Sequence, residues 1–256
     1  MITVVAYGGG VNSTALLVEM VRRGEPMDAV LFADTGGERP ETYQAVRDVS
    51  AWLVAAGRPA IVVVRKTYKG EPETLEANCE RMRMFPSIAY GFKSCSLKYK
   101  ADPQDKWVNN WQPARDEWAA GRKVVKVLGY DAGEERRAKI RESEKYTYRY
   151  PLIEWGIWRE DCDAILAGAG LVVGKSSCFF CPSMRKPEIL ELARMHPDLM
   201  RRALAMEARA ELTTVKGLGR RFSWAEFLAA AQAQTLTQRE LDFGGEPEAP
   251  CGCYDG

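Results

Sequence analysis

Three consecutive glycines, Gly8, Gly9 and Gly10, follow an apolar run over residues 2–7. That run is rich in β-branched residues and stops at the glycines, which is typical of a buried strand. Residues 12–23 then place apolar side chains at helical spacing until Gly24. A strand, a glycine turn and a helix in this order let a phosphate approach the backbone, where amide hydrogens and the helix dipole stabilise its charge.

The same alternation of strand and helix continues along the chain. It predicts further strands at 28–33, 60–65 and 123–130, and helices at 40–56, 104–120, 158–169, 187–214 and 223–234. Strands that alternate with helices favour an α/β fold with a doubly wound parallel sheet and a helical C-terminal part. We place a boundary near residue 172, with a nucleotide-binding domain at 1–172 and a cysteine-bearing helical region with an irregular tail at 173–256.

The composition fits a soluble globular protein of one large domain with an appendage. Hydrophobic residues make up 46% of 256 residues and the net charge is +1. No apolar run reaches the roughly 20 residues that a membrane span needs. The first residues carry no basic segment typical of a signal peptide, so we expect a cytoplasmic protein. Seven cysteines in such a chain favour metal, cluster or thiol chemistry over a disulfide framework.

Basic residues gather in two stretches although the whole chain is nearly neutral. They form either a local basic surface or solvated helix faces, and the sequence leaves both open. The stretches contain Arg81, Arg83, Lys93, Lys98 and Lys100, and then Arg136, Arg137, Lys139, Arg141, Lys145 and Arg149.

Polar turns follow the first, second and fourth predicted strands. Ligands of open α/β sheets bind at the carboxyl edge of the strands, so these turns predict one nucleotide site. Asp34 could orient a ribose or a magnesium ion, and Arg137 suits a second phosphate or a sulfate. The candidate nucleotide contacts are Tyr7, Gly8, Gly9, Gly10, Asn12, Ser13, Asp34, Thr35, Gly36, Gly129 and Glu134.

Five motifs occur in the order found in one known family. They are Gly8-Gly9-Gly10-Val11-Asn12-Ser13, Phe32-Ala33-Asp34-Thr35-Gly36 with Pro40-Glu41-Thr42, Cys95-Ser96-Leu97-Lys98, the turn 129–137 and the segment 150–155. With these motifs the chain resembles the phosphoadenosine-phosphosulfate (PAPS) reductase family, within the PP-loop ATP pyrophosphatase superfamily of adenine nucleotide α-hydrolase-like proteins.

The resemblance implies a ligand and a set of catalytic residues. The ligand is ATP with Mg²⁺, or adenylyl sulfate or its 3′-phosphate, and Lys98 and Arg137 contact its anionic groups. The implied catalytic residues are Asp34, Lys98, Arg137 and Cys253. The chain departs from the family in three ways. Val11 stands where many relatives have lysine. Asn12 replaces the aspartate usual in ATP-cleaving relatives, and the Glu-Cys-Gly-Leu-His motif of the true reductases is missing.

The cysteine pattern resembles that of adenylyl-sulfate reductases with a [4Fe-4S] cluster. Cys178 and Cys181 form a CxxC, which can share one metal or cluster, and Cys95 lies 83 residues earlier. We predict Cys95, Cys178, Cys181 and Cys251 as ligands. Cys79 or Cys253 could replace Cys251, or one iron could stay open. A zinc ion held by Cys178, Cys181, Cys251 and Cys253 is the alternative, and a mobile Cys253 could deliver sulfur or electrons.

The favoured function is ATP-dependent sulfur incorporation into nucleic acid, by DNA phosphorothioation or nucleobase thiolation. Its partners would be a nucleic acid and a cysteine desulfurase or another sulfur donor, with no membrane and with a homodimer as the expected assembly. One alternative is a sulfonucleotide reductase that releases sulfite. Another is a non-catalytic nucleotide- or DNA-binding component with a structural zinc. We expect Phe179, Phe180 and the tryptophans at 107, 111, 155 and 158 to be core residues.

Overall fold

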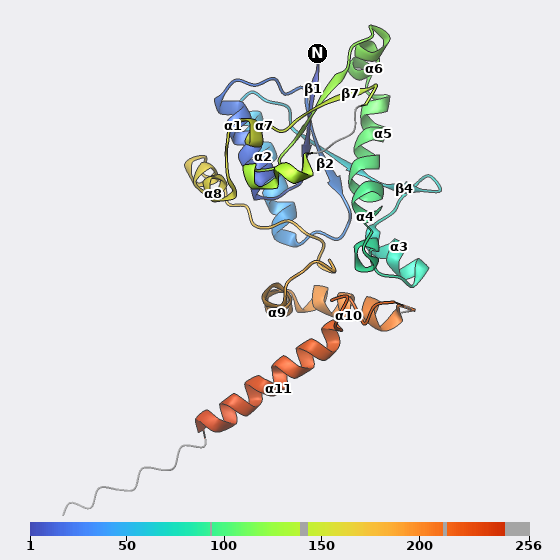
Figure 1. The fold of residues 1–256 in the computed structure, drawn as a ribbon, viewed down its shortest axis with the longest axis vertical. Coiled ribbons are helices and arrows are strands. Elements are labelled where there is room, and N and C mark those ends of the chain that lie inside the picture. The colour runs from blue at the N-terminus through green and yellow to red at the C-terminus, as the bar shows by residue number, and fades with distance from the viewer. Residues whose placement is uncertain (93, 139–142, 212–213, 244–256) are drawn as a thin grey trace, which may run out of the picture.

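The protein folds around one parallel sheet of five strands (Figure 1). In this computed structural model, the backbone is described for residues 1–92, 94–138, 143–211 and 214–243, and the side chains as far as residue 233. The strand order is β3-β2-β1-β6-β7, and every neighbouring pair is parallel. The strands are β1 (Thr3–Tyr7), β2 (Ala29–Asp34), β3 (Ile61–Arg65), β6 (Val124–Leu128) and β7 (Tyr146–Arg149).

Helices cover both faces of this sheet, which confirms the doubly wound α/β prediction. One face packs on α1 (Val11–Arg22), α2 (Pro40–Ala55) and α8 (Arg159–Gly168), and its core includes Leu16, Val49 and Leu166. The other face packs on α5 (Asp102–Asn110) and α6 (Gln112–Ala119). The inner strands β1, β2 and β6 are buried on both sides, so they read in the sequence as continuous apolar runs.

Prolines divide two helices that the apolar pattern predicts as continuous. The predicted helix 104–120 is split into α5 and α6 at Trp111, whose extended backbone precedes Gln112-Pro113. The predicted helix 187–214 is split into α9 (Lys186–Met195) and α10 (Pro197–Arg209) at His196. Pro197 disfavours helical backbone at His196, the residue before it. Pro113 has no amide hydrogen, and its ring would clash with the carbonyl four residues earlier, so α5 cannot continue through it, although Pro113 fits the first turn of α6.

The segment between β3 and α5 holds short elements, as its irregular sequence predicts. They are the hairpin of β4 (Thr67–Tyr68) and β5 (Glu71–Pro72), α3 (Leu75–Met82), η1 (Ser87–Tyr90), α4 (Ser94–Ser96) and η2 (Leu97–Ala101). The polar turn after β6 forms η3 (Ala132–Arg137), and α7 (Pro151–Glu154) follows β7.

Helices α9 (Lys186–Met195) and α10 (Pro197–Arg209) lie below the sheet in Figure 1 and contribute to a second hydrophobic core. It joins α3 and the residues around η1 to α9, α10 and the start of α11 (Trp224–Phe243), with Phe179, Phe180 and Trp224 fully buried. Core residues from 75–99 and from 178–224 thus pack together, and the division near residue 172 stays a prediction. Within the described residues, no helix is long and apolar enough to cross a membrane.

Candidate nucleotide and thiol site

The glycine turn occupies the carboxyl end of the central strand β1. Gly9 has φ of +72°, in the left-handed region, and an added Cβ would lie 3.0 Å from Phe32 and 3.1 Å from Thr42. A side chain there would be strained in backbone and crowded in space. Gly10 precedes the first turn of α1. The amides of that turn have no carbonyl four residues earlier to bond, so they are available to an anion.

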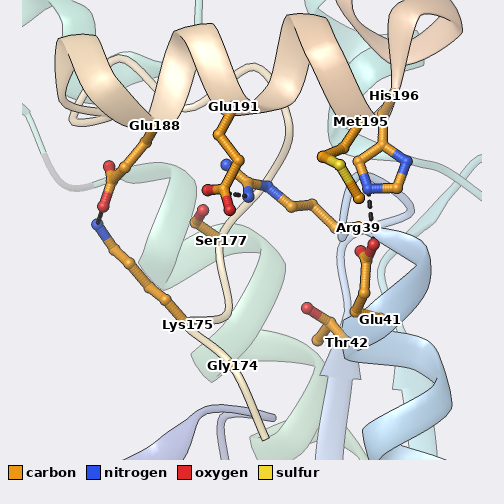
Figure 2. Close-up of a pocket in the computed structure, with 10 residues that line it drawn as sticks. All are labelled: Arg39, Glu41, Thr42, Gly174, Lys175, Ser177, Glu188, Glu191, Met195 and His196. Atoms are coloured by element: carbon orange, nitrogen blue, oxygen red, sulfur yellow. Dashed lines mark hydrogen bonds and ion pairs between the residues drawn. The ribbon is translucent and has the colours of Figure 1, made fainter.

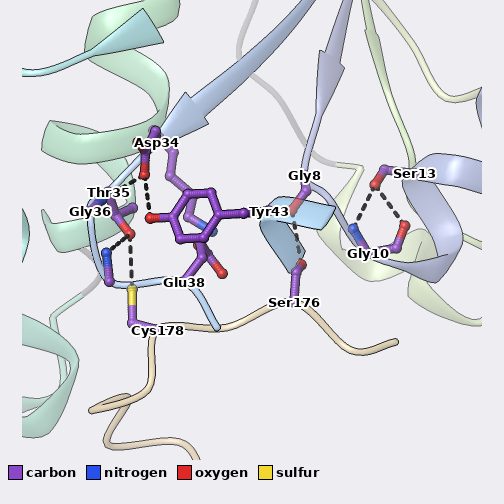
Figure 3. A network of polar contacts seen from close by, with 12 residues as sticks. Gly8, Gly10, Ser13, Asp34, Thr35, Gly36, Glu38, Tyr43, Ser176 and Cys178 are labelled. Carbon is purple, nitrogen blue, oxygen red and sulfur yellow. Dashed lines mark hydrogen bonds and ion pairs between the residues drawn. The ribbon is translucent and has the colours of Figure 1, made fainter. Parts of the chain in front are cut away.

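Hydroxyl groups hold the end of this turn. The Ser13 hydroxyl donates to the Gly10 carbonyl at 2.9 Å (Figure 3). The Thr14 hydroxyl donates to the same oxygen at 2.9 Å. The Tyr7 hydroxyl lies 3.1 Å from the Thr14 hydroxyl, and burial raises the pKa of Tyr7 to about 12. Tyr7 is therefore a neutral supporting residue beneath the turn.

The turn after β6 packs directly against the start of α1. A Cβ on Gly129 would lie 2.9 Å from the Ser13 Cα, so only glycine permits this approach. The Asn12 amide donates to Asp131 at 2.6 Å and approaches Glu134 at 3.5 Å. Strand order reverses between β1 and β6, which is where open α/β sheets bind ligands. Sequence reasoning placed Asn12 in the loop but did not identify Asp131.

Arg137 is held beside this turn by two contacts. It forms an ion pair with Glu134, and its guanidinium lies 4.4 Å from the centre of the Tyr130 ring. Tyr130 in turn stacks on Tyr150 at 5.6 Å. The predicted pair of Glu134 and Arg137 is thus brought to the glycine turn, and their contact with a ligand stays a prediction.

Asp34 is buried at the end of β2 and already has several hydrogen-bond donors. It accepts from the Gly36 amide at 2.8 Å, the Tyr43 hydroxyl at 2.7 Å and the Arg65 guanidinium at 2.7 Å. Burial and this carboxylate raise the pKa of Tyr43, which keeps its hydroxyl protonated as a donor. The structure places Asp34 at the predicted edge, where it joins the ends of β2 and β3. A direct contact with ribose or magnesium stays a prediction.

A segment from the C-terminal half crosses both turns. Ser176 donates its hydroxyl hydrogen to the Gly8 carbonyl at 2.9 Å (Figure 3). The Phe179 amide donates to the Gly37 carbonyl at 2.8 Å. The thiol of Cys178 lies 3.2 Å from the Thr35 hydroxyl. Residues 176–181, here called the thiol segment, therefore lie against the carboxyl edge of β1 and β2. Sequence reasoning missed Ser176, because no local pattern marks a partner 168 residues away.

The four described cysteines of the candidate set occupy neighbouring parts of the second core. Burial raises the pKa of the Cys79 thiol to about 12, and nearby Cys95 adds to the shift. Burial also raises the pKa values of Cys178 and Cys181, and Cys95 contributes at Cys181. Cys95 is thus close enough to both Cys79 and Cys181 to influence their pKa values. Cys162 lies elsewhere, buried in α8.

The described residues do not by themselves complete a metal centre. Among them, no three His, Cys, Asp or Glu side chains are arranged to hold a metal ion. Cys251 and Cys253, predicted as a ligand and as a sulfur carrier, lie outside the described residues. Ligation of a [4Fe-4S] cluster or of zinc by Cys95, Cys178, Cys181 and Cys251 therefore stays a prediction.

An ion pair between the half-buried Lys100 and the buried Glu38 lies beside the thiol segment. The Lys100 ammonium is 3.3 Å from one oxygen of Glu38, whose other oxygen has no hydrogen-bond partner among the described residues. Burial opposes the charge of Lys100, but Glu38 and the nearby Cys178 outweigh it and raise the pKa of Lys100. Neither residue was identified from the sequence, since 62 positions separate them.

Lys98, predicted to bind a phosphate, points elsewhere. It lines a depression beneath α3 together with Cys79 and Cys95, on the side of the second core. The structure thus brings Lys98 to the cysteines, whereas the glycine turn is accompanied by Arg137. Contact of Lys98 with an anion of the nucleotide therefore stays a prediction.

A charged cavity of about 240 Å³ separates α2 from α9 (Figure 2). Lys175 pairs with Glu188 at 2.7 Å, and Arg39 pairs with Glu191 at 3.7 Å. The ring of His196 lies 2.7 Å from Glu41. His196 stands at the junction of α9 and α10. The charged side chains that line the cavity are already paired with one another. The cavity is therefore a weaker candidate for a ligand site than the glycine turn.

Comparisons with known proteins find structural likeness without a match to a family model or a curated protein. A solved structure of the U34-tRNA thiolase NcsA from Methanococcus maripaludis, with its [4Fe-4S] cluster, aligns with 90% of this chain and 80% of its own. The alignment has 15% sequence identity and a TM-score of 0.42.

Proposed function

We propose that this protein binds ATP at the glycine turn and uses it to incorporate sulfur into a nucleic acid. The observation that carries the proposal is the hydrogen bond from Ser176 to the Gly8 carbonyl. It fixes the thiol segment, with Cys178 and Cys181, against the turn best suited to phosphates. Nucleotide activation and sulfur chemistry would then share one edge of the sheet.

The proposed reaction has two steps. An oxygen of the acceptor attacks the α-phosphorus of MgATP, and the bond from that phosphorus to the bridging oxygen breaks, which releases pyrophosphate. A hydrosulfide sulfur then attacks the activated atom of the acceptor. The bond to the adenylate oxygen breaks, and AMP leaves with the electron pair. Sulfur replaces oxygen, and no net oxidation or reduction occurs.

The chain's own residues would contribute positioning and charge stabilisation. The first-turn amides of α1 would donate to the phosphates, and the magnesium carried by ATP would neutralise part of their charge. Arg137 would leave Glu134 to meet the charge that develops at the α-phosphate. Glu38 pairs with Lys100 through its side chain and with Cys178 through its backbone, so this pair would hold the thiol segment in place at Cys178.

The proposal is tested with the full chain purified without oxygen. The protein is incubated with MgATP, hydrosulfide and either DNA or RNA, and both pyrophosphate and sulfur in the digested nucleic acid are measured. We expect acceptor-dependent pyrophosphate release and a mass increase of the acceptor that matches replacement of oxygen by sulfur. Arg137→Ala should lower both signals, whereas Arg47→Ala, an exposed substitution on α2, should leave them unchanged.

Two other outcomes would replace the proposal. Sulfite release from adenylyl sulfate with a thiol reductant would assign the site to a reductase. ATP binding without turnover of any nucleic acid would assign the protein to the non-catalytic class. Iron, zinc and sulfide analysis of the same sample tests the cysteine prediction separately.

A further inference from the structure

A depression of about 410 Å³ beneath α3 belongs to neither the glycine turn nor the charged cavity. This α3 pocket falls within the roughly 300–1,000 Å³ of small-molecule sites. Four aromatic rings line it, together with two methionines and two thiols. The lining side chains that matter here are Phe85, Tyr90, Phe92, Tyr99, Met82, Met84, Cys79, Cys95 and Lys98.

Several large apolar side chains at this pocket are exposed. Phe92 is 68% exposed, Met82 is 51% exposed and Met84 is 43% exposed. Single exposed apolar residues are ordinary, but three of them around one aromatic-lined depression indicate a surface that binds something flat and apolar. An exposed aromatic side chain beside a pocket is also the usual platform for stacking a base.

A second depression, of about 560 Å³, lies on the other side of η1. Ala89 and Gly91 line it from η1, and Arg220 and Arg221 line it from the loop before α11. Arg220 donates to the carbonyl of Ile88, which fixes the loop to η1. In the described part of the chain, neither arginine forms an ion pair with a carboxylate. Both guanidiniums can therefore meet an external anion.

The charge of the two depressions is uniform. Together they contribute Lys98, Arg220 and Arg221, and no carboxylate is among the described residues that line them. The cavity between α2 and α9 differs, because Glu41, Glu188 and Glu191 line it. An aromatic pocket beside an arginine pair, with no acid in either, complements a base attached to a phosphate backbone.

We infer that the α3 pocket receives a nucleobase from a single-stranded nucleic acid, while Arg220 and Arg221 receive neighbouring phosphates. The inference rests on the proposed function and narrows it: the sulfur acceptor is a base and not a phosphodiester. A base in a duplex is stacked and paired, so only an unpaired or extruded base can enter such a pocket.

The position of the pocket connects it to the nucleotide edge. Leu75 lines the pocket, and its amide donates to the Thr35 carbonyl at 2.9 Å. The side chain of Thr35 contacts Cys178. Cys95, in the pocket wall, lies near enough to Cys181 to influence its pKa. A base in the pocket would thus face the thiols while ATP occupies the adjacent turn.

Fluorescence anisotropy with labelled single-stranded DNA and RNA oligonucleotides tests the inference, with the matching duplexes for comparison. We expect a single strand to bind at least about tenfold more tightly than its duplex, and Phe92→Ala to weaken it about tenfold. Arg221→Ala should lower the slope of log affinity against log salt by about 0.7, the value for one lost phosphate contact on a single strand. Phe92→Ala should leave that slope unchanged.

Val172→Ala and Arg47→Ala are the matched controls, because both residues are exposed and line neither depression. Photo-cross-linking with a thio-substituted base in the strand locates the site, and we expect attachment to peptides that contain residues 82–95. Attachment elsewhere, or equal binding of duplex and single strand, would overturn the inference. A third outcome would also overturn the inference: Phe92→Ala changes the oligomeric state and leaves oligonucleotide binding unchanged. The surface around the α3 pocket would then be a contact between copies of the chain.

ATP binding by the same samples separates this inference from the proposed function. A protein that binds ATP but no single strand would refute the base pocket and leave nucleotide binding intact. A protein that binds the strand but not ATP would refute the proposed function while keeping the pocket.

Discussion

Ser176 and Gly8 lie 168 positions apart in the chain, yet the serine hydroxyl donates to the glycine carbonyl at 2.9 Å (Figure 3). The same hydroxyl oxygen would lie only 2.8 Å from a Cβ on Gly10. Absence of a side chain at position 10 thus lets the thiol segment settle on the glycine turn. The turn serves two partners: its amides suit a phosphate, and its carbonyl holds the segment that bears the cysteines.

Gly10→Ala should therefore separate the two elements. The Gly10 φ of −114° is accessible to alanine, so the effect comes from the contact with Ser176 and not from backbone strain. We expect the free energy of unfolding to fall by about 1–3 kcal/mol, as in other overpacked sites. The change is measured by urea denaturation.

Ser176→Gly in the Gly10→Ala background should recover most of that loss, because it removes the crowding hydroxyl. Gly174→Ala, two positions before Ser176, is the control, since nothing lies within 4 Å of its added Cβ. It should change stability by less than about 0.5 kcal/mol. Additive effects of the two substitutions at Gly10 and Ser176 would contradict the proposed contact.

Asn12→Asp should weaken the junction between the glycine turn and the turn after β6. The Asn12 amide is a donor to Asp131 at 2.6 Å and faces Glu134, so an aspartate there would add a third carboxylate. We expect a loss of about 2 kcal/mol in the free energy of unfolding, from one lost charged hydrogen bond and new repulsion.

The exchange of the two side chains provides the control. Asn12→Asp combined with Asp131→Asn restores one donor and one acceptor between the two positions. The asparagine at position 131 still has a side-chain oxygen that can accept from the Gly133 amide. Thermal unfolding should place the double variant close to the original protein. If the double variant is as unstable as Asn12→Asp alone, the pair is not the reason for asparagine at this position.

The sheet was largely predictable because its order follows from local signals. Buried parallel strands are continuous apolar runs, and β1, β2, β3 and β6 each end within two residues of the predicted limits. The edge strand β7 was missed. Its sequence of Tyr, Thr, Tyr and Arg is short and polar, and only its pairing with β6 makes it a strand.

The site was predictable where motif residues are consecutive, and not where contacts are distant. Gly9 and Gly10 were identified from the turn itself. Ser176, Glu38 and Lys100 have no sequence signature, because their roles depend on partners far along the chain. The core prediction was confirmed for Phe179 and Phe180 and wrong for Trp158, which is 55% exposed. Trp158 precedes α8 and stands at its surface, where burial is not required.

Glu207→Gln should destabilise the C-terminal helices. The buried carboxylate accepts from the amides of Leu218, Trp224 and Ala225 and from the Ser223 hydroxyl, at 2.7 to 2.9 Å. An amide group would turn one acceptor into a donor that faces other donors. We expect a loss of about 2–3 kcal/mol, followed by tryptophan fluorescence during urea denaturation. Glu226→Gln on the exposed side of α11 should have almost no effect, and an equal loss there would contradict the assignment.

The stability of the protein should fall in alkaline solution, with a contribution from Cys162. Burial raises the pKa of this thiol from 9.0 to about 11, so the folded state holds a proton that the unfolded state releases first. The stabilisation is full below the unfolded pKa and is lost as the pH rises from 9 through about 11. In that window this one proton gives a slope of at most about 1.4 kcal/mol per pH unit. Cys162→Ala should reduce the slope by that amount in denaturation measured at several pH values, and an unchanged slope would show that the thiol titrates normally.

Asp34 and Arg65 offer a way to separate positioning from direct contact with the nucleotide. The carboxylate joins the Arg65 guanidinium to the Tyr43 hydroxyl and the Gly36 amide at the end of β2. We expect Asp34→Asn to lower the free energy of unfolding by about 2 kcal/mol, less than for a fully buried ion pair, because Arg65 is half exposed.

ATP affinity then separates the two roles of Asp34. If Asp34 acts by holding this turn, Arg65→Gln should reduce ATP affinity by about the same factor as Asp34→Asn. The double variant should then add little, because both changes break one network. A loss of ATP affinity in Asp34→Asn that is much larger than in Arg65→Gln, with equal stability, would instead assign the carboxylate to the ribose or the magnesium ion. Equilibrium dialysis with ATP, with and without Mg²⁺, distinguishes these two roles.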